Sequence, residues 1–373
     1  IFKFGGASVK DAASVINILR VLKYNGFENT LIVISAMGKT TNALEQVVNL
    51  YYDNDKHFIP ELENVRKMHY QIIDELFKEN KKLVSKKVDE FFDEALNFLN
   101  NNSVNDYSFI YDQVVSIGEL VSTSIVSYFV ANNNIRNTWL DARKCIKTDY
   151  YYRDANLNWE TTLNNIKKLV DGNSTLISQG FIGSTKDGIT TTLGREGSDY
   201  SAAIFAYALS ADSVTIWKDV PGVLNGDPSQ FNDTILLNQI SYTEAIELAF
   251  YGASVIHPKT IQPLQRKGIP LFVKSFENPE NPGTSVSKGQ VLEPYVPCYI
   301  VKKNQTLLNL STKDFSFIVE ENISEIFALF HHYKMRVEMI QNSAISFSIC
   351  IFNKYDTIAP LVEELSLKFR VKV

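Results

Sequence analysis

The chain alternates short apolar runs with longer segments of mixed polarity. The first run is Ile1–Phe4, and Leu31–Ile34 is the second. Four later runs have the same character: Thr138–Leu140, Thr175–Ile177, Val214–Trp217 and Leu271–Val273. Runs that are apolar throughout are typical of strands buried on both faces, and the segments between them are long enough for crossover helices. We therefore expect an α/β fold, a layered and mostly parallel sheet with helices on both faces.

Residues 57–101 interrupt this alternation with a charged segment of helical period. Its apolar stripe consists of Leu62, Val65, Met68, Ile72, Ile73 and Leu76. Such spacing predicts amphipathic helices. We expect a helical pair or lid inserted into the sheet domain.

A cluster of prolines marks the expected domain boundary. Pro279, Pro282, Pro294 and Pro297 fall within nineteen residues that are also rich in Gly, Ser and Asn. Such punctuation is typical of a linker, so we place the domains at residues 1–293 and 294–373. The second part predicts a ferredoxin-like βαββαβ unit, with elements at Thr306–Leu310, Ile323–Tyr333, Arg336–Ile340, Ile345–Ile351, Ile358–Leu367 and Phe369–Val373.

Composition narrows the class of partner. The 373 residues carry a formal charge of −5 and contain no basic run longer than two residues, so neither nucleic acid nor an anionic membrane is expected. The three cysteines lack zinc or disulfide spacing, which fits a reducing cytoplasm. No apolar run approaches about 18 residues. Both ends fall inside strand patterns, so we expect a trimmed chain that acts on a small molecule.

Two turns after predicted strands have the chemistry of an anion site. In Lys3-Phe4-Gly5-Gly6-Ala7-Ser8, two glycines let backbone N–H groups approach a phosphate while the lysine points to the same oxygens. The alternative is a plain strand-to-helix turn with a surface lysine, which would have the same sequence pattern. Ser35 to Asn42 follows the next strand, and its hydroxyls could hold a carboxylate or phosphate. The alternative is a helix cap at Thr40 or Thr41.

Two further segments carry charge into apolar surroundings. Glu119 interrupts an apolar helical stretch from Tyr107 to Val130, where a buried carboxylate would need a cationic partner such as a substrate ammonium. The alternative is a Glu on the wet face of that helix. In the segment Thr192–Ser201, Arg195 precedes Ser198 and Asp199, which we expect to cap the helix Ala202–Leu209 beside an anion site.

Together these motifs resemble the aspartate kinases of the amino-acid kinase superfamily, over essentially the whole chain. The C-terminal unit resembles the amino-acid-sensing ACT domain of that family. Besides the turns above, the resemblance is carried by Gly118–Leu120, Gly180–Gly183, Ile216–Val223, Asp227-Pro228, Tyr251–Ala253, His257-Pro258 and Phe272–Ser275.

The resemblance implies ATP-dependent phosphorylation of the β-carboxylate of L-aspartate to 4-phospho-L-aspartate, on the route to lysine, threonine and methionine. Because a carboxylate has an unperturbed pKa of about 3.9, it attacks without a general base. The implied catalytic residues are Lys3, Asp199 and Arg195, and the substrate residues are Ser35, Thr41, Glu119, Arg195 and Ser198. The implied ATP residues are Lys3, Gly5, Gly6, Ser8, Trp217, Lys218, Asp219 and Asp227. Magnesium would come with ATP and water, with no metal cage of protein ligands.

The sequence departs from the family pattern at two nucleotide positions. Ser254 stands where the family has a phosphate-facing lysine, and we expect Lys218 to compensate. Ser229 and Gln230 follow Asp227-Pro228, where an arginine is usual.

The ACT-like unit implies feedback inhibition by L-lysine and pairing into a homodimer or higher oligomer. The implied effector residues are Phe315, Ser316, Val337, Glu338, Asn342 and Ser343. Glu338 would contact a lysine ammonium. The alternative is that Glu338 is only an exposed strand residue, since exposed carboxylates are common. Relatives carry a second ACT module that needs chain beyond Val373, so we expect this truncated chain to be active but uninhibited.

Two other functions stay open at this point. A sister kinase acting on glutamate, acetylglutamate or carbamate would share the fold and the glycine turns. A non-catalytic amino-acid sensor would explain the missing lysine at Ser254. The Ser35/Thr41 loop, Glu119 and the ACT-like unit argue against a sister kinase, and the joint presence of Lys3, Glu119, Arg195 and Asp199 argues against a sensor.

Overall fold

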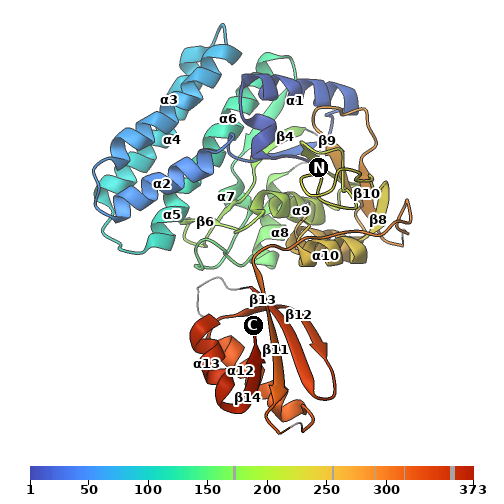
Figure 1. Cartoon of the computed structure of the whole chain (residues 1–373). Helices are drawn as coiled ribbons and strands as arrows, with labels where there is room; N and C mark the ends of the chain where they lie inside the picture. The colour runs from blue at the N-terminus through green and yellow to red at the C-terminus, as the bar shows by residue number, and fades with distance from the viewer. Residues whose placement is uncertain (171–173, 254–255, 290, 315, 353–357) are drawn as a thin grey trace. The chain divides into compact units, whose positions relative to one another are not determined.

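The computed structural model describes residues 1–170, 174–253, 256–289, 291–314, 316–352 and 358–373 (Figure 1). It divides into two compact units, Ile1–Tyr299 and Ile300–Val373. The division follows Tyr299 because the end of the proline-rich segment bonds back to the first unit: the Tyr299 N–H donates to Asn225 O, and Asn225 Nδ2 donates to Pro297 O.

An eight-stranded sheet forms the centre of the first unit, in the order β3-β4-β2-β1-β7-β9-β10-β8. All neighbouring pairs from β3 to β9 are parallel, β10 pairs antiparallel with β9, and β8 pairs parallel with β10, so β10 and β8 run against the other six strands. The strands are β1 (Phe2–Phe4), β2 (Leu31–Ile34), β3 (Asn137–Leu140), β4 (Thr175–Gln179), β7 (Val214–Lys218), β8 (Gln239–Ser241), β9 (Leu271–Ser275) and β10 (Thr284–Ser287). A separate hairpin pairs β5 (Ile182–Ser184) with β6 (Thr190–Thr192). The apolar runs therefore predicted the parallel strands correctly.

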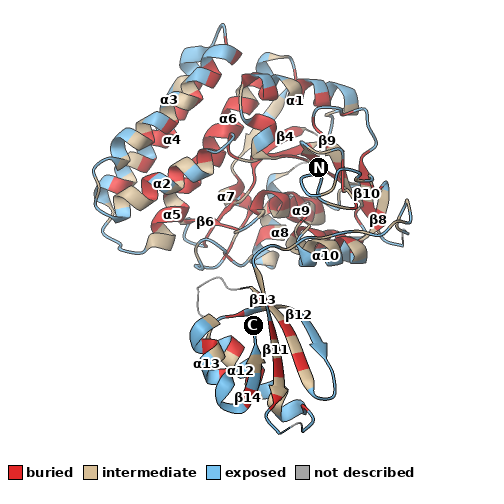
Figure 2. Ribbon diagram, viewed as in Figure 1, coloured by how far each residue is buried: buried red, intermediate tan, exposed pale blue. Residues whose placement is uncertain are grey.

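Helices cover the sheet on both faces, and α6 and α9 pack directly against its central strands (Figure 1). The helices of this unit are η1 (Gly6–Val9), α1 (Ala12–Asn25), α2 (Thr40–Tyr52), α3 (Phe58–Leu76), α4 (Lys81–Asn101), α5 (Tyr107–Val115), α6 (Ile117–Asn132), α7 (Ala142–Cys145), α8 (Trp159–Leu169), α9 (Gly197–Leu209), α10 (Tyr242–Tyr251) and α11 (Pro258–Lys267). The pair α3 and α4 occupies the segment with the charged helical pattern. Figure 2 shows buried residues along the strands and on α6 and α9, where the core of the unit lies.

The apolar stretch from Tyr107 onward is two helices, because the chain turns at Ser116 between α5 and α6. Tyr107–Asn132 is long and apolar enough to cross a membrane by composition, unlike our expectation from the apolar runs. However, 83% of that window is buried within the unit, as in the core helix of a water-soluble domain. It is therefore weak evidence for a membrane span.

The second unit is a four-stranded antiparallel sheet, in the order β12-β13-β11-β14, with two helices. Its elements are β11 (Gln305–Thr312), α12 (Glu320–His332), β12 (Arg336–Asn342), β13 (Ser346–Phe352), α13 (Ile358–Lys368) and β14 (Phe369–Lys372). This is the predicted βαββαβ order. The unit has its own core, in which Leu308, Ile326 and Phe330 are buried.

Candidate active site

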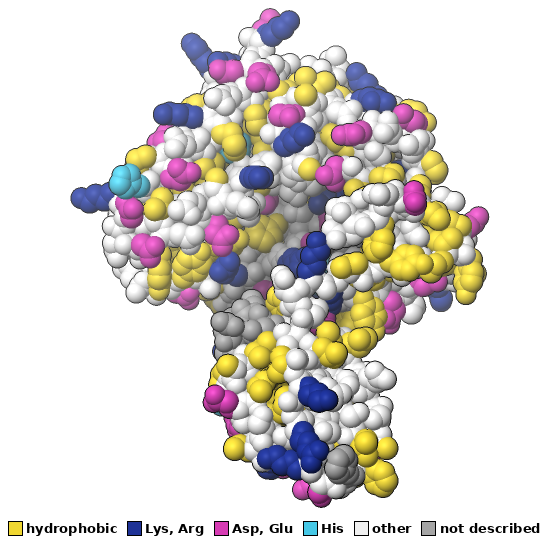
Figure 3. Space-filling model, viewed as in Figure 1, with side chains coloured by type: hydrophobic (Ala, Val, Ile, Leu, Met, Phe, Trp, Pro, Cys, Tyr) yellow, Lys and Arg dark blue, Asp and Glu magenta, His cyan; other side chains and the backbone are white. Residues whose placement is uncertain are grey.

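The first unit contains a cavity of about 510 Å³ where β1, β2, β7 and α9 meet. Parallel strands that end at one edge of a sheet bring distant segments together there. In space-filling form, this unit is hollowed on one face, with acidic and basic side chains along the hollow (Figure 3). The predicted residues that line the cavity are Lys3, Gly6, Ser35, Thr41, Glu119, Arg195, Ser198, Asp199 and Lys218.

The two predicted turns pack directly against each other. The Gly38 N–H donates to Gly6 O at 3.0 Å, and the Ser35 N–H donates to Phe4 O at 3.1 Å. A Cβ on Gly6 would lie 3.0 Å from the carbonyl oxygens of both Ala36 and Gly38. Glycine is therefore required at position 6 by this backbone approach.

Thr40 is the first residue of α2 and is buried, with its hydroxyl bonded to Met37 O at 2.6 Å. Lys39 precedes the helix, and no side chain caps it. The alternative reading of Thr40 or Thr41 as a cap is therefore wrong. Thr41 instead lines the cavity.

A buried ion pair lies on one side of the cavity. Lys3 Nζ is 2.6 Å from Asp199 Oδ1, and Lys218 Nζ is 3.8 Å from Asp199 Oδ2. Lys3 comes from β1, Lys218 from the end of β7 and Asp199 from the first turn of α9. Because β1 and β7 are neighbours, two cations face one carboxylate next to a helix N-terminus, an environment that favours anions.

The start of α9 differs from the expected cap. The helix begins at Gly197, so Ser198 and Asp199 lie in its first turn and do not cap it; the preceding Glu196 has a left-handed backbone. A Cβ on Gly180 would lie 2.4 Å from that of Ser198, so a glycine at position 180 lets the connection between β4 and β5 approach the helix. The close approach fixes Ser198 at the cavity wall.

Glu119 is buried at the other side of the cavity, with 2% of its surface exposed. Its Oε1 accepts a bond from the Ala36 N–H at 3.4 Å, while its Oε2 has no hydrogen-bond partner among the described residues. Burial raises the pKa of Glu119 to about 8. The alternative of a Glu on a wet helix face is therefore wrong, and the unpartnered oxygen suits a cationic ligand.

Arg153 and Tyr111 also line this side of the cavity, although neither was predicted. The guanidinium carbon of Arg153 lies 4.2 Å from the centroid of the Tyr111 ring, and its Nη2 donates to Glu45 Oε1 at 3.0 Å. Beneath them, the fully buried Asp112 accepts bonds from the backbone N–H groups of Arg153 and Thr192. Burial raises the pKa of Asp112 to about 7.

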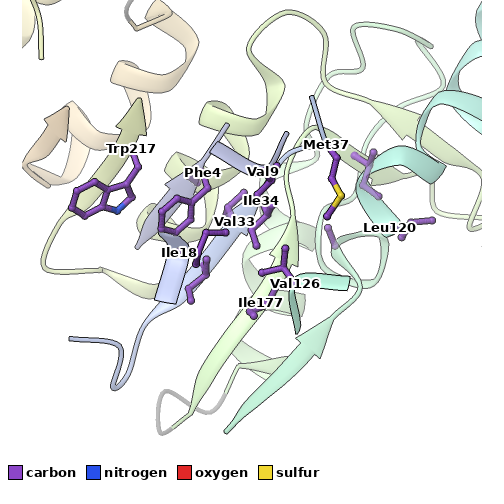
Figure 4. Close-up of a cluster of buried hydrophobic side chains, with 14 of the residues drawn as sticks. Phe4, Val9, Ile18, Val33, Ile34, Met37, Leu120, Val126, Ile177 and Trp217 are labelled. Atoms are coloured by element: carbon purple, nitrogen blue, oxygen red, sulfur yellow. The ribbon is translucent and has the colours of Figure 1, made fainter. Parts of the chain in front are cut away.

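Five predicted ATP residues do not line the cavity. The Trp217 side chain is buried in the core, stacked on Phe4 with ring centroids 6.2 Å apart (Figure 4). With 1% of its surface exposed, its side chain does not line the cavity, and its carbonyl accepts a bond from buried Ser8 Oγ. Gly5 adjoins Lys3 Nζ. Asp219 and Asp227 are exposed on the loop after β7.

The structure describes one of the two residues in the predicted compensation for the missing family lysine. Ser254 lies outside the described residues. Lys218 does line the cavity, beside Asp199, as the hypothesis requires. Its effect on ATP remains a prediction.

The predicted effector stretches of the second unit lie next to each other. The Ile318 N–H donates to Ala344 O at 3.0 Å, which joins the loop that contains Ser316 to the β12–β13 turn after Asn342 and Ser343. Glu338, beside Val337 on β12, is not an exposed strand residue: its side chain is 9% exposed and is paired with Lys302 and with Arg336 Nε at 3.0 Å. Phe315 lies outside the described residues.

Two residues, one lining the cavity and one buried beside it, carried a signal that sequence reasoning missed. Glu196 lies inside the Thr192–Ser201 motif, and Asp112 is a carboxylate in the same apolar stretch as Glu119. The argument that identified Glu119 applied to Asp112 unchanged. Arg153 follows three tyrosines with no recognisable spacing, so only the tertiary structure brings it to the cavity.

Comparisons with known proteins agree with this geometry. The model of the amino acid kinase family matches residues 1–275. Lysine-sensitive aspartokinase 3 of Escherichia coli is 30% identical over 100% of this chain and 84% of that protein. A chloroplastic bifunctional aspartokinase/homoserine dehydrogenase of Daucus carota is 28% identical over 99% of this chain, which spans only 42% of that relative.

Solved structures of E. coli aspartokinase III cover the whole chain and 84% of their own length. The T-state complex with lysine and aspartate matches with a TM-score of 0.82 at 27% identity. The R-state complex with aspartate and ADP matches with a TM-score of 0.81 at 28% identity. The chain therefore belongs to the amino acid kinase family and, within it, to the aspartokinases, the kinases that act on the carboxyl group of aspartate.

Proposed function

We propose that the cavity transfers the γ-phosphoryl group of ATP to the β-carboxylate of L-aspartate, and that the 4-phospho-L-aspartate formed enters the biosynthesis of lysine, threonine and methionine. One observation carries this proposal: the buried Glu119 has an unpartnered oxygen in the same cavity as the Lys3–Asp199 pair. A substrate with an ammonium at one end and a phosphate acceptor at the other satisfies both groups. The E. coli relative solved with aspartate and ADP supports the same pair of ligands.

Glu119 would receive the ammonium group of aspartate. Neutral Glu119 cannot form this ion pair, and an approaching ammonium lowers the pKa of the carboxyl, so binding and ionisation are coupled. Ser35, Thr41 and Ser198 place hydroxyl groups around the same volume, and Arg195 offers a fork that matches a carboxylate. These groups would orient the β-carboxylate towards the phosphates.

Lys3 would neutralise charge on the phosphoryl group during transfer, with Lys218 beside it. Asp199, at 2.6 Å and 3.8 Å from the two ammonium groups, keeps both side chains in place before ATP arrives. Such preorganised charges are the main contribution a protein makes to phosphoryl transfer. The attacking carboxylate is already a nucleophile at neutral pH, so no side chain needs to remove a proton. Backbone amides near Gly5, Gly6 and Ser8 would face the phosphates, with Asp219 and Asp227 further out.

Magnesium would enter with ATP. Among the described residues no group of three or more His, Cys, Asp or Glu is arranged to hold a metal ion. Mg²⁺ usually keeps several waters and takes one or two carboxylates plus phosphate oxygens, and Asp199, which lines the cavity beside Lys3 and Lys218, could supply one such carboxylate. The ion would supply charge neutralisation on the phosphates.

The second unit would bind L-lysine as a feedback inhibitor and pair with another copy of itself. The lysine-sensitive E. coli relative, solved with lysine, supports this assignment. The loop that contains Ser316 is bonded to the turn after Asn342 and Ser343, at the end of the predicted effector stretch that follows Glu338. However, Glu338 is already paired with Lys302 and Arg336, so a lysine ammonium would have to displace Lys302.

The test is coupled ADP release with Mg-ATP and L-aspartate, compared with L-glutamate and N-acetyl-L-glutamate, with hydroxylamine to trap an acyl phosphate. Aspartate-dependent ADP and a hydroxamate product are expected. Loss of both in Glu119→Ala and Arg195→Ala would link the reaction to this cavity. Turnover of another acid, or of none, would refute the proposal in favour of a sister kinase or a sensor.

A further inference from the structure

Strained backbone gathers around the cavity. Half of the ten described non-glycine residues with positive φ are asparagines, which adopt this conformation readily. Three of the others, Arg153 (φ 69°), Phe181 (φ 68°) and Glu196 (φ 54°), line the cavity. Strain of this kind costs about 1–3 kcal/mol per residue and persists at functional sites where the surroundings over-determine it. Of these three residues, Arg153 has the most side-chain hydrogen-bond donors, and no ligand has yet been assigned to them.

A single buried carboxylate holds the loop of Arg153 beside the loop of Arg195. The Arg153 N–H lies 3.2 Å and 3.1 Å from the two Asp112 oxygens. The same carboxylate accepts bonds from the Thr192 N–H at 2.9 Å and the Thr192 hydroxyl at 2.7 Å. The Ala155 N–H also donates to Thr192 O at 2.9 Å. Both arginines therefore sit on loops that are tied together at their base.

The guanidinium of Arg153 is oriented by neighbours that leave its fork usable. It lies over the rings of Tyr111 and Tyr107, at 4.2 Å and 5.3 Å from their centroids. Its bond to Glu45 uses one of the five N–H donors that a guanidinium carries. The side chain remains 42% exposed while it lines the cavity.

Arg153 belongs to the end of the cavity that contains Glu119. Its stacking partner Tyr111 lines the cavity, and the charges of Glu45 and Glu119 act on that tyrosine. Glu45 lies one turn after Thr41 on α2. The Lys3–Asp199 pair forms a different ion cluster, whose other member is Lys218.

We propose that Arg153 is a second carboxylate-binding arginine, which holds the non-reacting carboxylate of the substrate together with Arg195. The inference rests on the proposed function, because an amino acid with two carboxylates needs both held. Glu119 can match the ammonium, and one carboxylate must face the phosphates. The remaining carboxylate needs a cation at the amino-acid end, and a planar arginine fork on a rigid loop matches it.

The test compares L-aspartate with L-aspartate 1-amide, which lacks the charge of the non-reacting carboxylate but keeps the reacting one; its affinity is measured as the Ki with which it competes against aspartate. Arg153→Ala should raise the KM for aspartate about tenfold, as expected for one partly exposed charged hydrogen bond, with kcat nearly unchanged and the Ki of the 1-amide unchanged. Arg153→Gly should give the same KM as Arg153→Ala but a higher Tm than that variant, because glycine accepts the positive φ without strain. Arg195→Ala should show the same selectivity between the two ligands.

Lys259→Ala is the matched control. Lys259 is equally exposed and pairs with Asp154, next to Arg153, but does not line the cavity. Lys259→Ala removes the same charge as Arg153→Ala but no group that lines the cavity, so it should leave the KM for aspartate unchanged. A matching rise in its KM would mean that long-range electrostatics explains the effect of Arg153 and would overturn the proposal.

Two further results would overturn it: an unchanged KM in Arg153→Ala, or equal weakening of aspartate and the 1-amide, which would indicate a displaced loop. Affinities measured by calorimetry separate this inference from the proposed function. If the wild-type chain binds aspartate but releases no ADP, the proposed function fails, and selective loss of aspartate affinity still supports Arg153. If the wild-type chain binds neither acid, both fail.

Discussion

Replacing Glu119 by glutamine should stabilise the unliganded protein, by an amount that grows with pH. The side chain is 2% exposed, its Oε2 has no partner among the described residues, and burial raises its pKa from 4.5 to about 8. Ionisation of Glu119 is thus disfavoured in the folded state and free in the unfolded state. The contribution of the neutral carboxyl is fully present below pH 4.5 and is lost as the pH rises through 8.

The size of the effect follows from linkage. At about 1.4 kcal/mol per pKa unit, the shift destabilises the folded protein by about 2 kcal/mol at pH 6, about 3 kcal/mol at pH 7 and about 5 kcal/mol at pH 9. Glutamine does not titrate and has nearly the same shape. The free energy of unfolding of Glu119→Gln should therefore exceed that of the wild type by an amount that rises about 3 kcal/mol between pH 6 and pH 9.

Urea denaturation at several pH values measures this difference. Glu79→Gln, at an exposed position between α3 and α4, is the control and should show no such rise. A difference for Glu119→Gln that stays flat from pH 6 to pH 9 would refute the reasoning, because it would mean that Glu119 is not desolvated. Saturating aspartate should remove the wild-type deficit, and calorimetry in buffers of different ionisation enthalpy should detect a proton released on binding at pH 7.

Three other changes test the site and its regulation. Lys3→Met should lower kcat at least about 100-fold because a preorganised charge on the phosphoryl group is lost; aspartate affinity by calorimetry should be unchanged, and equal loss of both would contradict this role. Gly180→Ala should destabilise the protein by about 1–3 kcal/mol through its clash with Ser198, seen as a lower Tm; an unchanged Tm would show that the loop yields. Lys302→Ala should leave Glu338 paired with Arg336 alone and so lower the L-lysine concentration needed for binding to the chain; equal lysine-binding curves for variant and wild type by calorimetry would argue against displacement of Lys302.

Sequence reasoning predicted the sheet well because strands buried on both faces are mostly apolar. Such runs identified β1, β2 and β7 directly. The short hairpin β5–β6 has no comparable run, since Thr190–Thr192 is polar and is buried only through its neighbours. Its pairing is set by tertiary contacts that the sequence pattern does not encode.

The candidate site was predictable where a residue conflicts with its local sequence, and unpredictable where distant loops meet. Glu119 stands out in an apolar helix, and the glycine turns stand out after strands. Trp217 misled the prediction because a motif gives the position of a residue but not which way its side chain points, and this one packs into the core. Arg153 was invisible because its place depends on Asp112, 41 residues earlier in the chain.

Glu119 and Asp112 are both buried carboxylates, and they differ in their hydrogen bonds. Both are nearly inaccessible, and burial raises the pKa of each, to about 8 and about 7. Asp112 accepts bonds from Arg153 and Thr192 on both of its oxygens, so its charge is satisfied by the fold. Glu119 keeps one oxygen without a described partner. Because a buried carboxylate without a partner costs stability once it ionises, these hydrogen bonds support the proposal that Glu119 receives a substrate cation and that Asp112 holds the surrounding loops.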